Sequence, residues 1–246
     1  MTVGPITGIA IAATDEGVVG EFLGLFGLFD TGGRGAQITI IDCDHTAEPH
    51  TGFECGPRAI DLYVSDLDLA LKTLPPDSYA VSPVAEIRMG PVHMRQVMLT
   101  GPDAVQIVLV ESTHRRPSLL DEQPNRMFSE IHSVVWCVPD RDEEARRWVA
   151  AGFTKGMDLA FEEPSLSPYL GLPKPSVPIE MVMLSDASVS ATRLELLSFP
   201  GNAQPVRAHN PGASGIRSIS FAEVPACAVE RSGALRITAG GVCVSD

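Results

Sequence analysis

Polar residues interrupt several apolar, strand-like segments of the chain, and these side chains are the best suited to chemistry. Asp61 and Tyr63 lie two residues apart, so a β-strand would place both on one face. Arg193 and Glu195 have the same spacing in a second apolar segment. A carboxylate among apolar side chains has a raised pKa and can act as a general acid or base. The pattern therefore indicates Glu195, Asp61 and Tyr63 as catalytic candidates, with Tyr63 able to bind a substrate oxygen.

Each candidate also has a purely structural explanation. Glu195 could form an ion pair with Arg193 or Arg217. Asp61 could be a solvated acid on an edge strand, and Tyr63 could simply pack. No GxGxxG, Walker or GxSxG sequence is present, so these motifs do not indicate a nucleotide-binding loop or a serine hydrolase.

Composition excludes several classes of protein. The 246 residues carry 18 Lys and Arg against 31 Asp and Glu, a net charge of −13, which disfavours binding to nucleic acid or an anionic membrane. No run of about 18 apolar residues predicts a membrane span. The first residues lack the basic region of a secretion signal, and the five cysteines are scattered without a CxxC pair. These features predict a cytoplasmic protein with reduced cysteines.

A repeated pattern positions the candidate residues. Each copy reads as an apolar strand, an acidic helix start, a helix and up to three further strands, which predicts an α+β fold. Two full copies and two shorter ones are expected at about 57–112, 130–200, 5–45 and 215–246. The copies suggest an N-terminal domain (1–115), a linker (116–128) and a C-terminal domain (129–246).

One segment between the strands is rich in proline. Residues 162–178 contain five prolines, and a loop of this length is often a lid or a binding loop. A solvated surface excursion is the alternative. If the loop covers a site, Tyr169 could contact the substrate.

Several short motifs, in their order and spacing, resemble one superfamily. They are Val64-Ser65-Asp66-Leu67-Asp68, Gly101-Pro102-Asp103, Val138-Pro139-Asp140-Arg141-Asp142, Leu194-Glu195-Leu196, and Pro211-Gly212 before Ile219-Ser220-Phe221. Together they resemble the vicinal oxygen chelate superfamily, which includes glyoxalase I, methylmalonyl-CoA epimerase, the bleomycin- and fosfomycin-resistance proteins and the extradiol dioxygenases. The resemblance implies tandem βαβββ units that form two cup-shaped, mostly antiparallel half-barrels with helices outside. It also implies a monomer or a homodimer.

Metal-dependent members of this superfamily take a His from the first strand of a unit and a Glu from its last strand. The His slot, seven residues before the conserved Asp position, falls on Gly8, Ala59, Ser133 and Ser218 in this sequence. The Glu slot falls on Val108 and Glu195 in the two full units. His132 lies one residue from a slot, and strict alternation places it outside the cup unless a bulge restores it. The resemblance therefore implies no metal. The alternative is a divalent metal (Fe, Mn, Zn, Ni or Mg) on His132 and Glu195, with Glu223 or Asp246 as a third ligand.

Further residues are expected to line the cup and contact a substrate: Gln106, Arg193, Cys137, Ser133 and Ser218. Three functions follow, each with a small hydrophobic or aromatic organic ligand. The first is a metal-independent isomerase, lyase or cyclase that performs acid–base chemistry on a carbonyl or aromatic substrate. The second is a protein that binds and sequesters a hydrophobic compound. The third is a metal-dependent enzyme of the glyoxalase or dioxygenase type.

Overall fold

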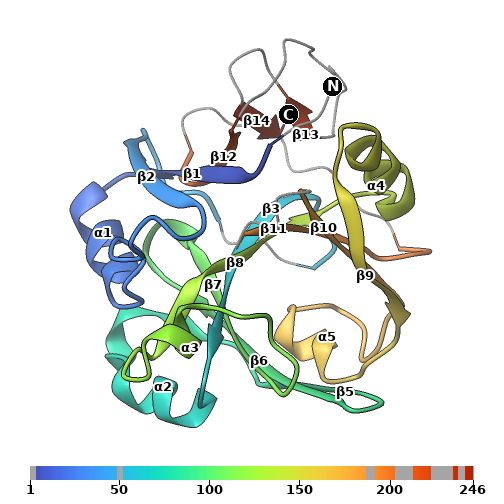
Figure 1. Ribbon diagram of the computed structural model, residues 1–246, viewed down its shortest axis with the longest axis horizontal. Helices are drawn as coiled ribbons and strands as arrows, with labels where there is room; N and C mark the ends of the chain where they lie inside the picture. Colours follow the sequence, from blue (N-terminus) through green and yellow to red (C-terminus); the bar gives the residue numbers. More distant parts are fainter. Residues whose placement is uncertain are drawn as a thin grey trace.

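The computed structural model describes residues 4–48, 52–186, 192–202 and 213–222, and the backbone of two short strands, 235–237 and 242–245. The strands form two sheets (Figure 1). The smaller has the order β13-β14-β12-β1-β2, with β1 (Ile6–Ala13), β2 (Gln37–Asp42), β12 (Gly215–Phe221), β13 (Leu235–Ile237) and β14 (Val242–Ser245). The larger has nine strands in the order β4-β6-β7-β3-β8-β11-β10-β9, and β5 also pairs with β6. These are β3 (Gly56–Val64), β4 (Ala80–Val81), β5 (Ala85–Met89), β6 (Val92–Thr100), β7 (Gln106–Ser112), β8 (Phe128–Cys137), β9 (Thr154–Phe161), β10 (Ile179–Ser185) and β11 (Arg193–Ser198).

The helices are α1 (Glu16–Gly24), α2 (Leu67–Thr73), α3 (Leu119–Glu122), α4 (Arg141–Ala150) and α5 (Leu166–Tyr169), with 3₁₀ turns η1 (Pro76–Ser78) and η2 (Pro102–Ala104). The three longer helices begin at the predicted acidic starts, whereas α3 lies in the predicted linker and α5 in the predicted proline-rich loop. An aspartate caps each of the three longer helices, because the side chains of Asp15, Asp66 and Asp140 accept hydrogen bonds from amides of the first turn. In Figure 1, α1, α2 and α4 lie at the periphery, whereas α5 lies between β9 and β6.

The strand pairing confirms the α+β class and shows which units combine. The first strands of the two full units, β3 and β8, pair antiparallel at the centre of the larger sheet. The last strands, β7 and β11, flank them in parallel. The two shorter units pair through β1 and β12 in the smaller sheet. Each sheet therefore combines units from both halves of the chain, which differs from the expected cup in each half. The domain boundaries at 115 and 129 stay a prediction.

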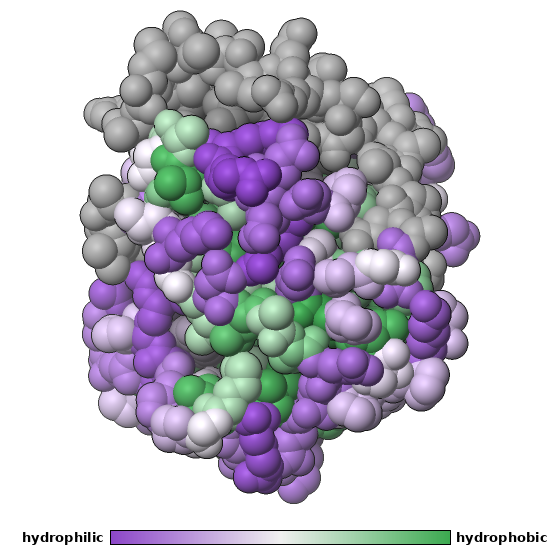
Figure 2. All heavy atoms as spheres, turned by 90° about the vertical axis from the view of Figure 1, so that its right-hand side faces the viewer, coloured by the Kyte–Doolittle hydropathy of each residue, from purple (hydrophilic) through white to green (hydrophobic). Residues whose placement is uncertain are grey.

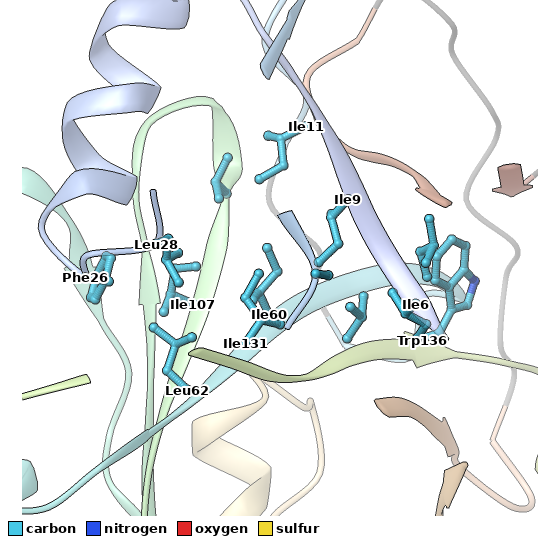
Figure 3. Close-up of a cluster of buried hydrophobic side chains, with 14 of the residues drawn as sticks. Ile6, Ile9, Ile11, Phe26, Leu28, Ile60, Leu62, Ile107, Ile131 and Trp136 are labelled. Carbon is cyan, nitrogen blue, oxygen red and sulfur yellow. The ribbon is translucent and has the colours of Figure 1, made fainter. Parts of the chain in front are cut away.

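The main hydrophobic core lies between the two sheets (Figure 3). In β3, Ile60 and Leu62 face this core, where they meet Ile9 and Ile11 of β1. The alternate residues of β3 face the opposite, concave side of the larger sheet. This alternation separates a structural core from a second buried cluster inside the cup.

One face of the molecule has hydrophilic side chains around an apolar centre (Figure 2). Figure 2 shows the side that faces right in Figure 1, where a central apolar area is bordered by hydrophilic side chains. Within the described residues, no helix is both long enough and apolar enough to span a membrane.

Asp103 ties the η2 turn to the first unit. Its Oδ2 accepts a hydrogen bond from the Thr14 amide at 2.8 Å, and its Oδ1 accepts from the hydroxyls of Thr14 and Thr46, also at 2.8 Å. Asp103 and Ala104 both have positive φ, 55° and 60°, a conformation that Asp tolerates better than most residues. The carboxylate therefore stabilises both the turn and the contact between units.

We expect Asp103→Ala to lower the free energy of unfolding by about 2–3 kcal/mol at pH 7, because three hydrogen bonds to a charged group are lost. Burial opposes ionisation, but the hydrogen bonds from Thr14 and Thr46 outweigh it and hold the pKa of Asp103 below its usual value. The contribution is therefore complete above the usual Asp pKa of about 4 and is lost as the pH falls through the folded value.

Urea unfolding of both proteins between pH 7 and pH 3 measures this difference. The exposed Asp77→Asn is the control and should change little. A difference between wild type and Asp103→Ala that is as large at pH 3 as at pH 7 would contradict the assignment.

Candidate active site

A cavity of about 210 Å³ lies in the cup of the larger sheet. Its apolar wall is unusual in being rich in methionine, which is flexible and polarizable and so adapts to different ligand shapes. Six of the eight methionines of the chain line it: Met89, Met94, Met98, Met157, Met181 and Met183. Val108, Val135 and Leu197 also line it. Polar residues are the minority of the lining, as in ligand sites generally.

Asp61 and Glu195 line this cavity together, from β3 and β11. The intervening strand β8 contributes Ser133, whose Oγ donates to Asp61 Oδ2 at 2.6 Å. Asp61 is 4% exposed, and Glu195 is half-buried in the wall of the cavity. Each carboxyl group shifts the pKa of the other, so the two lie close together, and a hydrogen bond between them requires a proton on one of them. Arg193 supplies the compensating positive charge for the pair.

The environment determines which carboxyl group keeps that proton. Burial raises the pKa of Asp61 to about 6, against the opposing effects of Ser133, Glu195 and Arg193. Burial and the charge of Asp61 raise the pKa of Glu195 well above its usual value, and Arg193 offsets this only in part. At neutral pH the pair therefore holds one proton, on Glu195, while Asp61 is ionised. Like other coupled carboxyls, the two titrate as a unit.

His132 also lines the cavity, because β8 contains a bulge. Leu62 pairs with Ile131 and Asp61 pairs with Ser133, so β8 has one residue more than β3 between these pairs. The extra residue turns His132 to the same side as Ser133, whereas Ile131 faces the main core. The expected position of His132 outside the cup is therefore wrong, and the bulge named as the alternative is present.

The contacts of His132 define its protonation. Its ring stacks on Tyr63 with centroids 3.9 Å apart. Arg193 Nη2 donates to His132 Nδ1 at 3.1 Å and to the Tyr63 hydroxyl at 3.2 Å. Burial and the charges of Arg193 and Arg116 hold the pKa of His132 well below its usual value, so the ring is neutral. Because Nδ1 accepts, the proton is on Nε2, which has no hydrogen-bond partner among the described residues.

Arg58 is a polar residue of the cavity that sequence reasoning missed. Pro57 pairs with Trp136 and Ala59 with Val135, so Arg58 is an extra residue in β3 and this second bulge turns it into the cup. It is 3% exposed. The only sequence signal was a charged residue directly before an apolar strand, which also fits an exposed strand end.

Tyr169 lines the cavity and comes from the proline-rich segment 162–178. This segment reaches across the cup, because Ser165 exchanges hydrogen bonds of 3.1 Å with the backbone of Glu86 on β5. The segment therefore covers the cavity rather than extending into solvent. Burial and the charges of Asp61 and Glu195 raise the pKa of Tyr169 well above its usual value, so its hydroxyl stays protonated.

The remaining predicted contact residues lie at other positions. Gln106 and Cys137 are buried on β7 and β8 but do not line the cavity. Cys137 Sγ accepts a hydrogen bond from Arg58 at 3.7 Å. Ser218 lies on β12 in the other sheet, beside Ala10. Their roles in substrate binding stay predictions.

Among the described residues, the side chains of the cup do not fit a metal ion. Three of the four superfamily slots in the cup hold Ala59, Val108 and Ser133, and Glu195 is the fourth. Within the described ranges, no group of three or more His, Cys, Asp or Glu side chains could hold a metal. The Arg193 guanidinium donates a hydrogen bond to His132 Nδ1, and its positive charge would repel a metal cation beside His132. The further ligands considered from sequence, Glu223 and Asp246, lie outside the described residues.

Comparisons with known proteins identify the fold. No family model and no curated protein sequence match this chain. A single-site variant of glyoxalase I from Zea mays is 11% identical, with a TM-score of 0.61 over 98% of this chain and 92% of that one. A proposed dioxygenase from Bacillus subtilis is 13% identical, with a TM-score of 0.54 over 89% of this chain and 70% of that one. At this identity the likeness concerns the fold alone. The chain has the vicinal oxygen chelate fold, as the sequence motifs predict.

Proposed function

We propose that this chain is a metal-independent enzyme that transfers protons on a small, mostly apolar organic substrate with a carbonyl or phenol oxygen. One observation carries the proposal: two carboxyl groups, Asp61 and Glu195, line the same apolar cavity, where burial raises the pKa of each. Titratable groups whose surroundings separate their pKa values are typical of acid–base pairs in enzymes. The fold supports a general likeness to glyoxalase- and dioxygenase-type structures.

The two carboxyl groups take different roles in this mechanism. Ionised Asp61 accepts a proton from the carbon beside the substrate carbonyl, which leaves an enolate. Protonated Glu195 then donates its proton to the substrate at a second position, which completes an isomerisation. Because the proton gained by Asp61 can pass to Glu195 along their hydrogen bond, the pair returns to its starting state. This refines the sequence-based expectation, in which Glu195 was the principal acid or base and Asp61 its helper.

His132 is suited to hold the substrate oxygen. A neutral imidazole with a free Nε2–H donates a hydrogen bond to a developing enolate, and it resists losing its own proton. Arg193 fixes the tautomer through Nδ1, and Tyr63 holds the ring plane by stacking. The donor is therefore oriented before the substrate binds, which is the condition for electrostatic stabilisation of a transition state.

Sequestration of a hydrophobic compound is the second candidate. The methionine-rich wall favours it, because such surfaces accept varied ligands. A binding protein would return its ligand chemically unchanged after long incubation. The acid–base pair and the oriented His132 donor have no role in that function, which is why proton transfer is the preferred proposal.

We expect Glu195→Gln to abolish proton transfer while the fold is retained, because the amide cannot carry the exchanging proton. The probes are 4-phenylbutan-2-one and 4-phenyl-2-oxobutanoate in D₂O, with loss of the α-hydrogen signals followed by ¹H NMR. The enzyme-dependent exchange rate should fall by roughly 100-fold or more. The exposed Glu21→Gln should exchange at the wild-type rate. Equal exchange rates in wild type and Glu195→Gln, with unchanged circular dichroism, would contradict the proposed role of Glu195 in proton transfer.

The pH dependence of kcat/KM tests the assignment of the base. Activity should rise as the pH passes through about 6, because Asp61 must be ionised to accept a proton. It should fall at higher pH, where Glu195 loses its proton. Asp61→Asn should remove most of the activity. If that variant kept both substantial activity and the rise near pH 6, another group would be the base.

Replacing His132 by Phe tests the proposed oxygen contact. The aromatic ring preserves the stacking on Tyr63 but removes the Nε2–H. We expect kcat to fall by roughly 100-fold with a small change in KM, because the lost hydrogen bond strengthens in the transition state. The rise in activity near pH 6 should persist, since neutral His132 does not produce it. A change confined to KM would indicate that His132 only helps to bind the substrate.

A further inference from the structure

We propose that the substrate is an organic carboxylate and that Arg58 binds its carboxylate group. This inference names the substrate class of the proposed enzyme and rests on that proposal for the reacting end of the cavity. The binding step itself can be measured without any turnover.

Arg58 is a buried cation whose hydrogen bonds in the described part of the chain go to uncharged groups. Its Nη1 donates to Gly52 O at 3.1 Å and to Cys137 Sγ at 3.7 Å, and its Nη2 donates to Leu170 O at 2.9 Å. No carboxylate within the described ranges forms an ion pair with it. A guanidinium cannot lose its proton under ordinary conditions, so the charge stays buried and uncompensated. An anionic ligand group would supply the missing charge.

Donor capacity remains on the guanidinium. Nε is buried and has no hydrogen-bond partner within the described part of the chain. Nη2 has a second hydrogen besides the one given to Leu170. The two carbonyl contacts hold the planar group in place, so it is oriented before a ligand arrives. Guanidinium groups of this kind recognise carboxylates by paired hydrogen bonds.

The charge balance of the cavity favours one anionic group. Three guanidiniums line it. Arg116 lies within electrostatic range of Glu130 and Asp186. Arg193 interacts with the Asp61–Glu195 pair, which has a net charge of −1 when it holds one proton. Arg58 is the remaining cation. A single negative charge on a ligand would therefore provide Arg58 with a counter-charge beside its guanidinium.

The location of Arg58 also suits a substrate held for proton transfer. Its charge and that of Glu195 both act on Tyr169 and on Cys137, so the cation and the carboxyl pair lie near the same side chains. A cavity of about 150 Å³ holds benzene, so the cavity of about 210 Å³ has room for one aromatic ring and a short chain. A carboxylate on Arg58 would fix one end of such a molecule while its carbonyl carbon faces the acid–base pair.

Calorimetric binding of two matched probes, 4-phenylbutanoate and 4-phenylbutanamide, tests the proposal. They have the same shape and differ in the charge of one end. We expect the carboxylate to bind wild type at least about tenfold more tightly than the amide, as is typical of a charged hydrogen bond. Arg58→Gln should lose this preference and leave the affinity for the amide nearly unchanged. Arg58→Lys, which keeps the charge, should retain part of it. Arg88→Gln, on the exposed part of β5, is the matched control and should behave as wild type.

The outcomes separate this proposal from the proposed function. If neither probe binds, if both bind wild type equally, or if Arg58→Gln keeps the preference, the carboxylate assignment is wrong. If Arg58→Gln fails to fold, Arg58→Lys provides the test. A preference of this variant for the carboxylate over the amide as large as that of wild type would contradict a bidentate contact between Arg58 and the carboxylate, and thus the proposal. Glu195→Gln should keep the preference for the carboxylate. If Glu195→Gln loses α-hydrogen exchange but keeps the preference for the carboxylate, proton transfer and carboxylate binding belong to different residues.

Discussion

The antiparallel pairing of β3 with β8 is the constraint on which the rest of the structure depends. It joins the two full units into one sheet, and it brings the polar side chains of β3 beside those of β8. Each strand contains a bulge, and the bulged residues, Arg58 and His132, both turn into the cavity. A regular pair of strands would leave both side chains in the main core, where neither could be solvated. The bulges therefore allow an apolar core and a polar site to share the same two strands.

The polar groups of the cavity are stable because they compensate one another. Arg193 contacts His132 and Tyr63, and its charge offsets that of the Asp61–Glu195 pair. Burial favours the neutral form of both carboxyl groups, whereas the hydrogen bond from Ser133 and the charge of Arg193 favour ionisation of Asp61. Burial and the same guanidinium together hold the pKa of His132 low. Arg193 thus influences the protonation of an acid, a base and a neutral donor, which links the fold directly to the chemistry proposed for the site.

The sequence predicts those elements that leave a regular hydrophobic period or a capping residue. The acidic helix starts, the strand that carries Asp61 and Tyr63, and the four related units are all visible as patterns with a fixed period. A bulge cannot be recognised in this way, because an inserted residue shifts the period but has no characteristic residue type. For this reason the sequence predicted the wrong face for His132 and did not indicate Arg58. The combination of units was also hidden, since strand pairing between distant segments depends on tertiary contacts. Glu195 was found because its slot in the superfamily pattern does not depend on those bulges.

The residues in the slots that hold metal ligands in members of the vicinal oxygen chelate superfamily favour an acid–base role in this chain. Ala59, Val108 and Ser133 offer at most a hydroxyl, so the one carboxylate in these slots, Glu195, has no set of ligands among the described residues with which to share a cation. In the proposed enzyme a proton takes the place of the cation. Ser133 supports this arrangement, because its hydroxyl donates to Asp61 and stabilises the ionised member of the pair. A residue that would weaken a metal site therefore strengthens the acid–base pair.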